Sequence, residues 1–227
     1  MSVSLEQLRN EFDRWAREGR GEQMKDGHLA VTEQIIGMMR LRPDSRVLDL
    51  GCGSGWATRL LAAHVQDGVA VGLDVSEEMV RQARNHGAVP PNANFRVLTG
   101  PRFPFHDGVF THCLSIESLY YHPDITASLR EVHRVLARGG RAFLMMNFFQ
   151  ENPYVHHWAG LLSVPVHLWS ALDYCDAAHE AGFAECRHLT IPDPTPVAPD
   201  YRGPHYGDAE KMRAARAIGA LVVIAQK

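Results

Sequence analysis

The sequence predicts an α/β fold in which a mostly parallel sheet is covered by helices on both faces. Short apolar segments rich in β-forming residues alternate with helical patterns along the chain, and strands that are apolar throughout are typical of such a sheet. The chain has 227 residues, 45% hydrophobic and 22% charged, which suits one domain. We expect a single domain over 1–227, divided into an N-terminal helical cap (1–42), a core (43–149), and a last part (150–227) of long loops and final strands.

The cap is expected to contain two helices. The first begins at Ser4, because "SLEQ" has the S-x-x-Q form of a capping box, and it ends at the glycines of "EGRGE". A second helical pattern covers roughly 28–41 and ends before Pro43. One face of the first helix carries apolar residues, which are expected to pack over the domain: Leu5, Leu8, Phe12 and Trp15.

The remaining elements alternate. A helix is expected over 123–136, where Pro123 takes a first-turn position that needs no N–H and Gly139-Gly140 ends the pattern; another is expected over 168–182. Two stretches, 147–167 and the proline-rich 192–209, are too long for simple turns, which is typical of functional loops. Strands are expected at 46–51, 69–75, 94–100, 110–116, 141–149, 184–191 and 216–225.

Composition narrows the functional classes. The 23 basic and 26 acidic residues give no basic footprint for nucleic acid or an anionic membrane, and no apolar run approaches the ~20 residues that span a bilayer. Four cysteines without a C-x-x-C pair, and no signal-peptide pattern, indicate free thiols in a reducing cytoplasm. Neither H-E-x-x-H nor D-x-D occurs, so we expect no catalytic metal.

The most informative segment is "RVLDLGCGSGWATRLLA" at 46–62, where a strand enters a loop with glycines at 51, 53 and 55. Ligands bind at the carboxyl ends of parallel strands, and Gly51, Gly53 and Gly55 allow a close backbone approach there. Asp74 ends the next strand, 19 residues after Gly55. A carboxylate at that place accepts hydrogen bonds from both hydroxyls of a ribose. The segment therefore predicts an adenosine site.

The ligand does not look like a dinucleotide. Dinucleotide loops need G-x-G-x-x-G or A, but the third position is Trp56 or Thr58, depending on the frame. Asp49, two residues before the loop, adds a negative charge that disfavours a pyrophosphate and favours a locally positive ligand. The amino group and sulfonium of S-adenosylmethionine fit that description. Cys52 is interpreted as a small residue that fills space beside the loop.

A series of motifs carries a family resemblance. "VLDLGCGSG", "GLDVSEEMVRQAR", "FPFHDGVF" and "EVHRVLARGGRAFL" together resemble class I S-adenosylmethionine-dependent methyltransferases, in the small-molecule group related to quinone-biosynthesis C-methyltransferases. The resemblance is close over roughly 46–149. It implies a Rossmann-like, seven-stranded, mostly parallel sheet with a C-terminal antiparallel hairpin, formed here by 184–191 and 216–225.

The resemblance also implies roles for the cofactor site. Asp49 and the glycines would hold the methionine end, Asp74 the ribose, and Met79 would pack beside the adenine. The acidic residue that usually reads the adenine amino group is replaced by Thr99, followed by Gly100. Adenine recognition is therefore expected to use Thr99 and main-chain groups. The full set of expected cofactor-binding residues is Asp49, Gly51, Cys52, Gly53, Gly55, Asp74, Val75, Met79, Thr99, Gly100 and Ser115, with Trp15 and His28 from the cap, which is expected to fold over as a lid.

The acceptor is expected beneath the loops that follow the fourth, fifth and sixth strands, which are rich in aromatic residues and histidine. Methyl transfer is an in-line displacement with a good leaving group, so positioning and desolvation supply much of the acceleration. A base is needed only where the nucleophile must lose a proton. The candidates are Glu117, Tyr121, His122 and His205.

The sequence thus predicts a cytoplasmic methyltransferase that acts on a small molecule and uses S-adenosylmethionine, with its acceptor atom and oligomeric state open. Two main alternatives stay open: a non-catalytic S-adenosylmethionine-binding protein, and a nicotinamide-dependent oxidoreductase. A nucleic-acid or protein methyltransferase is a further alternative. The near-neutral charge disfavours it, as does "SIES" where amino-group methyltransferases often have N-P-P-Y.

Overall fold

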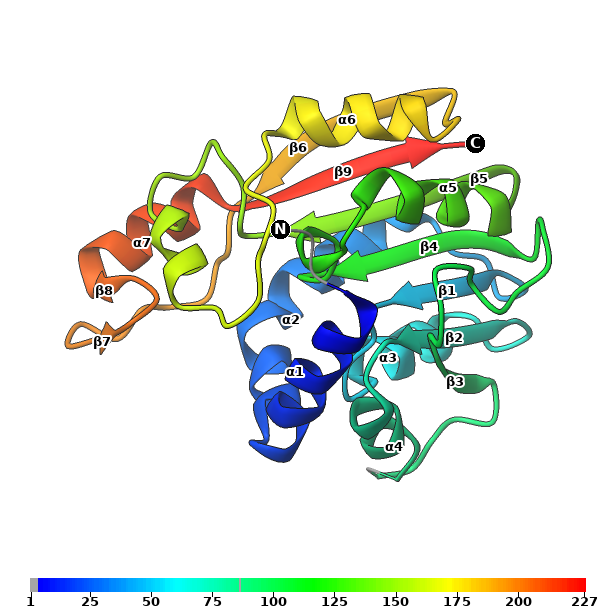
Figure 1. The fold of residues 1–227 in the computed structure, drawn as a ribbon, viewed down its shortest axis with the longest axis horizontal. Coiled ribbons are helices and arrows are strands. Elements are labelled where there is room, and N and C mark those ends of the chain that lie inside the picture. The colour runs from blue at the N-terminus through cyan, green and yellow to red at the C-terminus, as the bar shows by residue number, and fades with distance from the viewer. Residues whose placement is uncertain (1–3, 86) are drawn as a thin grey trace.

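The computed structural model describes residues 4–85 and 87–227 and contains a seven-stranded sheet in the order β3-β2-β1-β4-β5-β9-β6 (Figure 1). All neighbouring strands are parallel except β9, which lies antiparallel between β5 and β6. The expected fold class, with its C-terminal antiparallel pair, is confirmed. The strands are β1 (Arg46–Leu50), β2 (Val69–Asp74), β3 (Ala93–Val97), β4 (Phe110–Ile116), β5 (Leu136–Met146), β6 (Glu185–Ile191) and β9 (Ala220–Gln226), and a small hairpin joins β7 (Arg202–Gly203) to β8 (Gly207–Asp208).

Helices cover both faces of the sheet. They are α1 (Leu5–Arg17), α2 (Arg20–Met39), α3 (Trp56–His64), α4 (Glu77–Asn85), α5 (Ile125–Val135), α6 (Ala171–Glu180) and α7 (Ala209–Ile218), with short 3₁₀ turns η1 (Leu119–Tyr121) and η2 (His156–Gly160). Within the described residues, no helix is long and apolar enough to cross a membrane.

Alternate residues of the central strands point into two separate cores. Leu144 and Met146 of β5 share one core with α5 and α6, whereas Phe143 and Met145 share the other with α2 and α3. This division follows from the two-residue period of a strand. Since both faces are buried, the strands are apolar throughout, which is the pattern that predicted them.

Strand order reverses between β1 and β4, because the chain runs outward through β2 and β3 and then returns to the other side of β1. The carboxyl ends of β1, β4 and β5 all point toward α7 and the β7–β8 hairpin, with α1 and α2 beside them (Figure 1). Open α/β sheets bind ligands at this crevice. The fold therefore brings the glycine loop, the N-terminal cap and the late loops to one edge.

Four predicted boundaries were wrong. α2 begins at Arg20 instead of residue 28, because the single left-handed residue Gly19 (φ 76°) turns the chain and the helix then continues through Gly21 and Gly27. β3 ends at Val97, before the expected 100. β5 begins at Leu136, since the strand incorporates the glycine pair that was expected to end a helix.

The fourth error concerns α7, which occupies 209–218 where the sequence predicted the end of a loop and the start of a strand. Asp208 begins this helix by accepting a hydrogen bond from the N–H of Lys211 (2.9 Å), and Gly219 (φ 88°) separates it from β9. The apolar run 218–225 hid that break. The capping box at Ser4 and Gln7 is confirmed.

Candidate active site

A single cavity of about 810 Å³ lies at the carboxyl edge of the sheet, within the range of small-molecule sites. One end is formed by the glycine loop and the ends of β2 and β3. The other end is formed by α1, the segment from the end of β4 through η1, η2, and the turn between β7 and β8. We call these the cofactor end, with Asp49, Gly51, Gly53, Asp74, Met79 and Leu98, and the acceptor end, with Phe12, Glu117, Tyr121, Trp158, His205 and Tyr206.

The three glycines of the loop meet different surroundings. A Cβ at Gly51 would overlap the hydroxyl of Ser118, and one at Gly55 would overlap the ring of Phe95, so packing requires both glycines. Gly53 has φ +51° and no atom within 4 Å of the position that a Cβ would occupy. The free space above Gly53 belongs to the cavity, so this residue leaves room for a ligand rather than for a neighbouring side chain.

Asp74 is fixed by the loop that it faces. Its Oδ2 accepts from the N–H of Gly53 (2.8 Å), and its Oδ1 accepts from the N–H of Ser76 (2.9 Å). Burial raises the pKa of Asp74, while these two N–H groups lower it. Each carboxylate oxygen can accept a second hydrogen bond, which leaves room for the two hydroxyls of a ribose.

Asp49 is buried at the base of the cavity, with 1% of its surface exposed. The hydroxyl of Thr58 donates to its Oδ2 (2.6 Å), and no basic side chain among the described residues forms an ion pair with it. Burial, together with the charge of Asp74, raises the pKa of the Asp49 carboxyl to about 7. A buried carboxyl without a cation fits a ligand that brings a positive charge, such as the amino group of S-adenosylmethionine.

The N-terminal cap closes the cofactor end. The guanidinium of Arg9 donates to the carbonyls of Val75 (3.2 Å) and Leu98 (3.3 Å), at the ends of β2 and β3. The carboxylate of Asp13 accepts from the Ser76 hydroxyl (2.5 Å). The Ser54 hydroxyl donates to the Gly21 carbonyl (3.2 Å). These contacts hold α1 and the start of α2 against the cofactor end.

At the acceptor end, Glu117 follows β4 in a left-handed conformation (φ 51°) that is uncommon outside glycine. Its Oε2 accepts from the Tyr120 hydroxyl (2.8 Å) and its Oε1 from the N–H of Asn147. Burial raises the pKa of the Tyr121 hydroxyl, and the charge of Glu117 raises it further. Both tyrosines are therefore neutral donors near this carboxylate.

The two candidate catalytic histidines also line the cavity. Burial lowers the pKa of His122 to about 4, so its ring is neutral, with Nδ1 2.8 Å from the Ser128 hydroxyl and Nε2 3.4 Å from the Ser118 hydroxyl. Burial also lowers the pKa of His205, and His157 lowers it further. A neutral imidazole can accept a proton, but the serines already contact both nitrogens of His122.

Most expected site residues line this cavity, including all four candidate catalytic residues and Trp15 and His28 of the cap. Four expected cofactor residues lie outside the lining: Gly55, Thr99, Gly100 and Ser115. β3 ends early, so Leu98 reaches the cavity and Thr99 faces outward. Ser115 is buried within β4, and its hydroxyl has no hydrogen-bond partner.

Sequence reasoning missed Asn152, Asp193, Arg216 and Arg20, which line the acceptor side. Asp193 and Arg216 form a mostly buried ion pair (2.9 Å) that holds the loop after β6. No local motif marks this pair, because Asp193 and Arg216 lie far apart in the chain. Within the described residues, no group of three His, Cys, Asp or Glu side chains is arranged to hold a metal ion.

Comparisons with known proteins agree with this geometry. Residues 47–140 match the family model described as "Methyltransferase domain". The 27-O-demethylrifamycin SV methyltransferase of Amycolatopsis mediterranei is 31% identical over 125 residues, 53% of this chain and 45% of that protein. The demethylmenaquinone methyltransferase of Symbiobacterium thermophilum is 32% identical over 112 residues, 48% of this chain and 45% of that protein. The chain thus spans less than half the length of these two curated relatives.

A solved structure matches nearly the whole chain. It is the complex between the Haloferax volcanii Trm112 methyltransferase activator and the putative methyltransferase, in which one chain is 31% identical to this one with a TM-score of 0.86. The match covers 95% of this chain and 97% of that chain. The motif series, the sheet order, the cavity and these matches lead to one conclusion: the chain belongs to the class I S-adenosylmethionine-dependent methyltransferases.

Proposed function

We propose that this protein transfers a methyl group from S-adenosylmethionine to a small-molecule acceptor. One observation carries the proposal: the space above Gly53, between Asp49 and Asp74, continues into an aromatic acceptor end within one cavity of about 810 Å³. A donor and an acceptor bound in the same cavity meet the requirement for in-line displacement.

The residues of the cofactor end have distinct roles in this proposal. Asp49 binds the amino group of the methionine part, and Asp74 binds the ribose hydroxyls. Val75, Met79 and Leu98 form the apolar walls around the adenine, beneath the cap. When bound, S-adenosylmethionine supplies an electrophilic methyl group on a sulfonium whose sulfur is a good leaving group.

The chain's own contribution is to position the acceptor and exclude water. The cap and the late loops cover the cavity, so a bound acceptor is desolvated before transfer. Glu117, Tyr121, His122 and His205 are the groups that can hold or receive a proton there. Of these, Glu117 is held in place by two hydrogen bonds that leave its carboxylate at the cavity surface.

The cavity and the cysteines also support a class of acceptor and a cellular compartment. A cavity of about 810 Å³ favours a small molecule over a nucleic acid or a membrane surface, and four free cysteines support a reducing cytoplasm. We also propose that this chain binds a Trm112 activator, because the 31% identical chain was solved in complex with one. Co-expression with a Trm112 protein, followed by co-purification, tests this proposal.

The activity is tested with S-adenosylmethionine carrying a labelled methyl group and a panel of small phenols, amines and carbon acids. The expected result is transfer of label to at least one small acceptor and formation of S-adenosylhomocysteine. Binding of S-adenosylhomocysteine without transfer to any acceptor would favour the non-catalytic alternative. Transfer only to an added RNA or protein would favour a macromolecular acceptor.

A further inference from the structure

A carboxylate without a cationic partner lies inside the acceptor end. Glu117 is 7% exposed, and its two oxygens accept from the Tyr120 hydroxyl and from the N–H of Asn147, both of them neutral donors. No Lys, Arg or His of residues 4–85 and 87–227 forms an ion pair with it. A buried negative charge of this kind is costly unless a positive charge arrives with a ligand.

Aromatic rings surround this carboxylate. The rings of Phe12 and Tyr121 meet edge to face with centroids 5.1 Å apart, and Tyr121 lies 4.4 Å from Tyr120. Trp158 packs against Tyr206 with ring centroids 5.4 Å apart, and we call the rings of Phe12, Tyr120, Tyr121, Trp158 and Tyr206 the belt. Burial raises the pKa of the Tyr206 hydroxyl, and the charge of Glu117 raises it further, so the carboxylate also acts on this ring of the belt.

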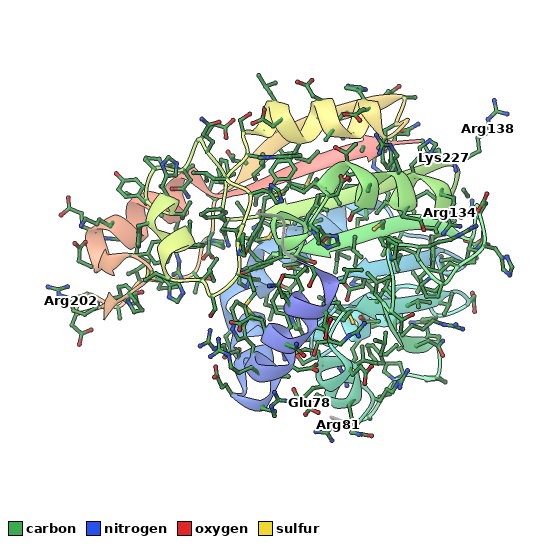
Figure 2. All side chains as sticks on the ribbon, viewed as in Figure 1. Glu78, Arg81, Arg134, Arg138, Arg202 and Lys227 are labelled. Atoms are coloured by element: carbon green, nitrogen blue, oxygen red, sulfur yellow. The ribbon has the colours of Figure 1, made fainter. Side chains whose placement is uncertain are left out.

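The basic side chains that line the cavity are already engaged. Arg20 forms an ion pair with Glu18 (2.9 Å) and its guanidinium lies 4.9 Å from the centroid of the Trp15 ring. Arg216 is paired with Asp193. Arg202, on β7, projects away from the body of the molecule (Figure 2). A carboxylate or phosphate group on the acceptor would therefore find no unpaired cation among the described lining residues.

The backbone holds Glu117 in place at a cost. A left-handed conformation is unfavourable for a residue with a Cβ, and here it lies at the end of β4, where the cavity begins. The N–H of Glu117 also donates to the carbonyl of Met145 (2.9 Å). The strained backbone is thus held in place where the Glu117 carboxylate lines the cavity.

We propose that the acceptor is an amine, a primary or secondary aliphatic nitrogen on an apolar or aromatic body, held as an ammonium between Glu117 and the surrounding rings. An ammonium supplies the missing positive charge and is attracted to the faces of aromatic rings. The apolar body fits among the rings of the belt. This inference rests on the proposed function, since it names the substrate class of the same cavity.

The transfer balances with these groups alone. The ammonium first releases a proton, which Glu117 is placed to accept, and this frees the nitrogen lone pair. The lone pair forms the N–C bond while the C–S bond breaks and leaves its electron pair on sulfur. The amine gains a methyl group together with the positive charge that the sulfonium carried, and Glu117 passes its proton to solvent as product leaves.

The test is calorimetric binding of matched amines and alcohols to the protein saturated with S-adenosylhomocysteine. Three pairs are used: tryptamine and tryptophol, 4-phenylbutylamine and 4-phenylbutanol, and dodecylamine and dodecanol. We expect at least one amine to bind at least about tenfold more tightly than its alcohol. In Glu117→Gln this preference disappears, whereas the exposed control Glu210→Gln keeps it.

A second variant guards against a folding defect in Glu117→Gln. Tyr206→Leu removes a ring of the belt and keeps Glu117, so the amine preference is expected to fall about threefold to tenfold; Tyr206→Phe keeps the ring and most of the preference. The proposal is overturned if no amine binds more tightly than its alcohol, or if Glu117→Gln keeps the preference. It is also overturned if Glu117→Gln weakens S-adenosylmethionine relative to S-adenosylhomocysteine, because the carboxylate then serves the sulfonium. Failure to bind S-adenosylhomocysteine at all contradicts the proposed function itself.

Discussion

The two ends of the cavity are built differently. The cofactor end is made from one short stretch of chain and its neighbours in the sheet, and its polar groups are fixed by main-chain N–H donors, as at Asp74. The acceptor end collects side chains from α1, η1, η2, the loop before β7 and the β7–β8 turn, and more of its polar groups are fixed by other side chains, as at Asp193 and Arg216. The first end therefore depends more on the backbone, and the second depends more on side chains.

Because of this difference, the two ends should respond differently to amino-acid substitution. A backbone site depends on torsion angles and strand ends, so a substitution there disturbs the fold and the ligand together. A side-chain site can exchange residues while the sheet stays the same, because loops tolerate variation. Substitutions at the two ends should therefore give opposite patterns in cofactor affinity and in acceptor use.

The largest effect is expected for Asp74→Asn. The amide keeps the shape but offers one acceptor where the carboxylate offers two, so the N–H of Gly53 or of Ser76 loses its partner and the ribose loses a charged acceptor. Affinity for S-adenosylhomocysteine should fall at least about 100-fold, from two hydrogen bonds of ~1.5–3 kcal/mol each. Calorimetry measures this affinity, with the exposed Asp67→Asn as the control. Equal affinity for wild type and Asp74→Asn would contradict the assignment of the ribose to Asp74.

Arg216→Met should show the reverse pattern. It leaves Asp193 unpaired and removes the guanidinium that donates to the carbonyl of Thr195 (2.6 Å), so the loop after β6 loses its anchor. The free energy of unfolding should fall by about 2–3 kcal/mol. The rate of methyl transfer to the acceptor should fall at least about tenfold. Affinity for S-adenosylhomocysteine should stay within about twofold. The exposed Arg213→Met serves as the control, and a parallel loss of cofactor affinity would contradict the separation of the two ends.

Cofactor affinity should depend on pH through Asp49. Because burial raises the pKa of this carboxyl to about 7, a cationic amino group must displace a proton below that pH. Affinity for S-adenosylhomocysteine should therefore fall about tenfold from pH 8 to pH 6, and Asp49→Asn should flatten the profile.

The same carboxyl should make stability depend on pH. Without cofactor, the folded protein holds this proton where the unfolded chain does not. The contribution of Asp49 to the free energy of unfolding thus decreases as pH rises from about 4 to about 7, and urea denaturation at several pH values measures that trend.

A smaller effect is expected for Gly53→Ala. The left-handed torsion costs an alanine about 1 kcal/mol, and its methyl group would occupy only the space where the ligand lies. The torsion is strained with or without ligand, so the free energy of unfolding should fall by about 1 kcal/mol. Cofactor affinity should fall about fivefold or more, because the methyl group occupies space that the ligand needs. Gly51→Ala should mainly destabilise the protein, because its Cβ overlaps Ser118.

Gly100→Ala tests the expected role of Gly100 in adenine binding. Unchanged affinity for S-adenosylhomocysteine would remove this residue from the site.

The sequence predicted the cofactor end far better than the acceptor end. The glycine loop and Asp74 lie close along the chain and their spacing reflects one strand–helix–strand unit, so a local pattern was enough. Even there, β3 ends earlier than expected, so Leu98 lines the cavity and Thr99 does not. The sequence could not give this boundary, since the last residue pair of a strand depends on the neighbouring strand. The alternation of strands and helices also predicted the parallel sheet, and the resemblance to class I methyltransferases predicted its final antiparallel pair.

The acceptor end could be predicted only as a set of loops. The ion pair of Asp193 and Arg216 joins residues from a loop and a helix that the sequence did not separate, because the apolar run after Arg216 hid the break at Gly219. The ion pair of Arg20 with Glu18 lies at the start of α2. The sequence did not predict a helix start there, because the segment that follows contains glycines. Side-chain partners across loops leave no periodic trace in the sequence, so they had to be found in the structure.

The central claim is that the glycine loop binds S-adenosylmethionine. Calorimetric titration of the purified protein with S-adenosylhomocysteine, and with NADH in parallel, tests it most directly. The account predicts saturable binding of S-adenosylhomocysteine at one site per chain and no binding of NADH. Binding of NADH alone would contradict it and would direct attention to hydride transfer instead.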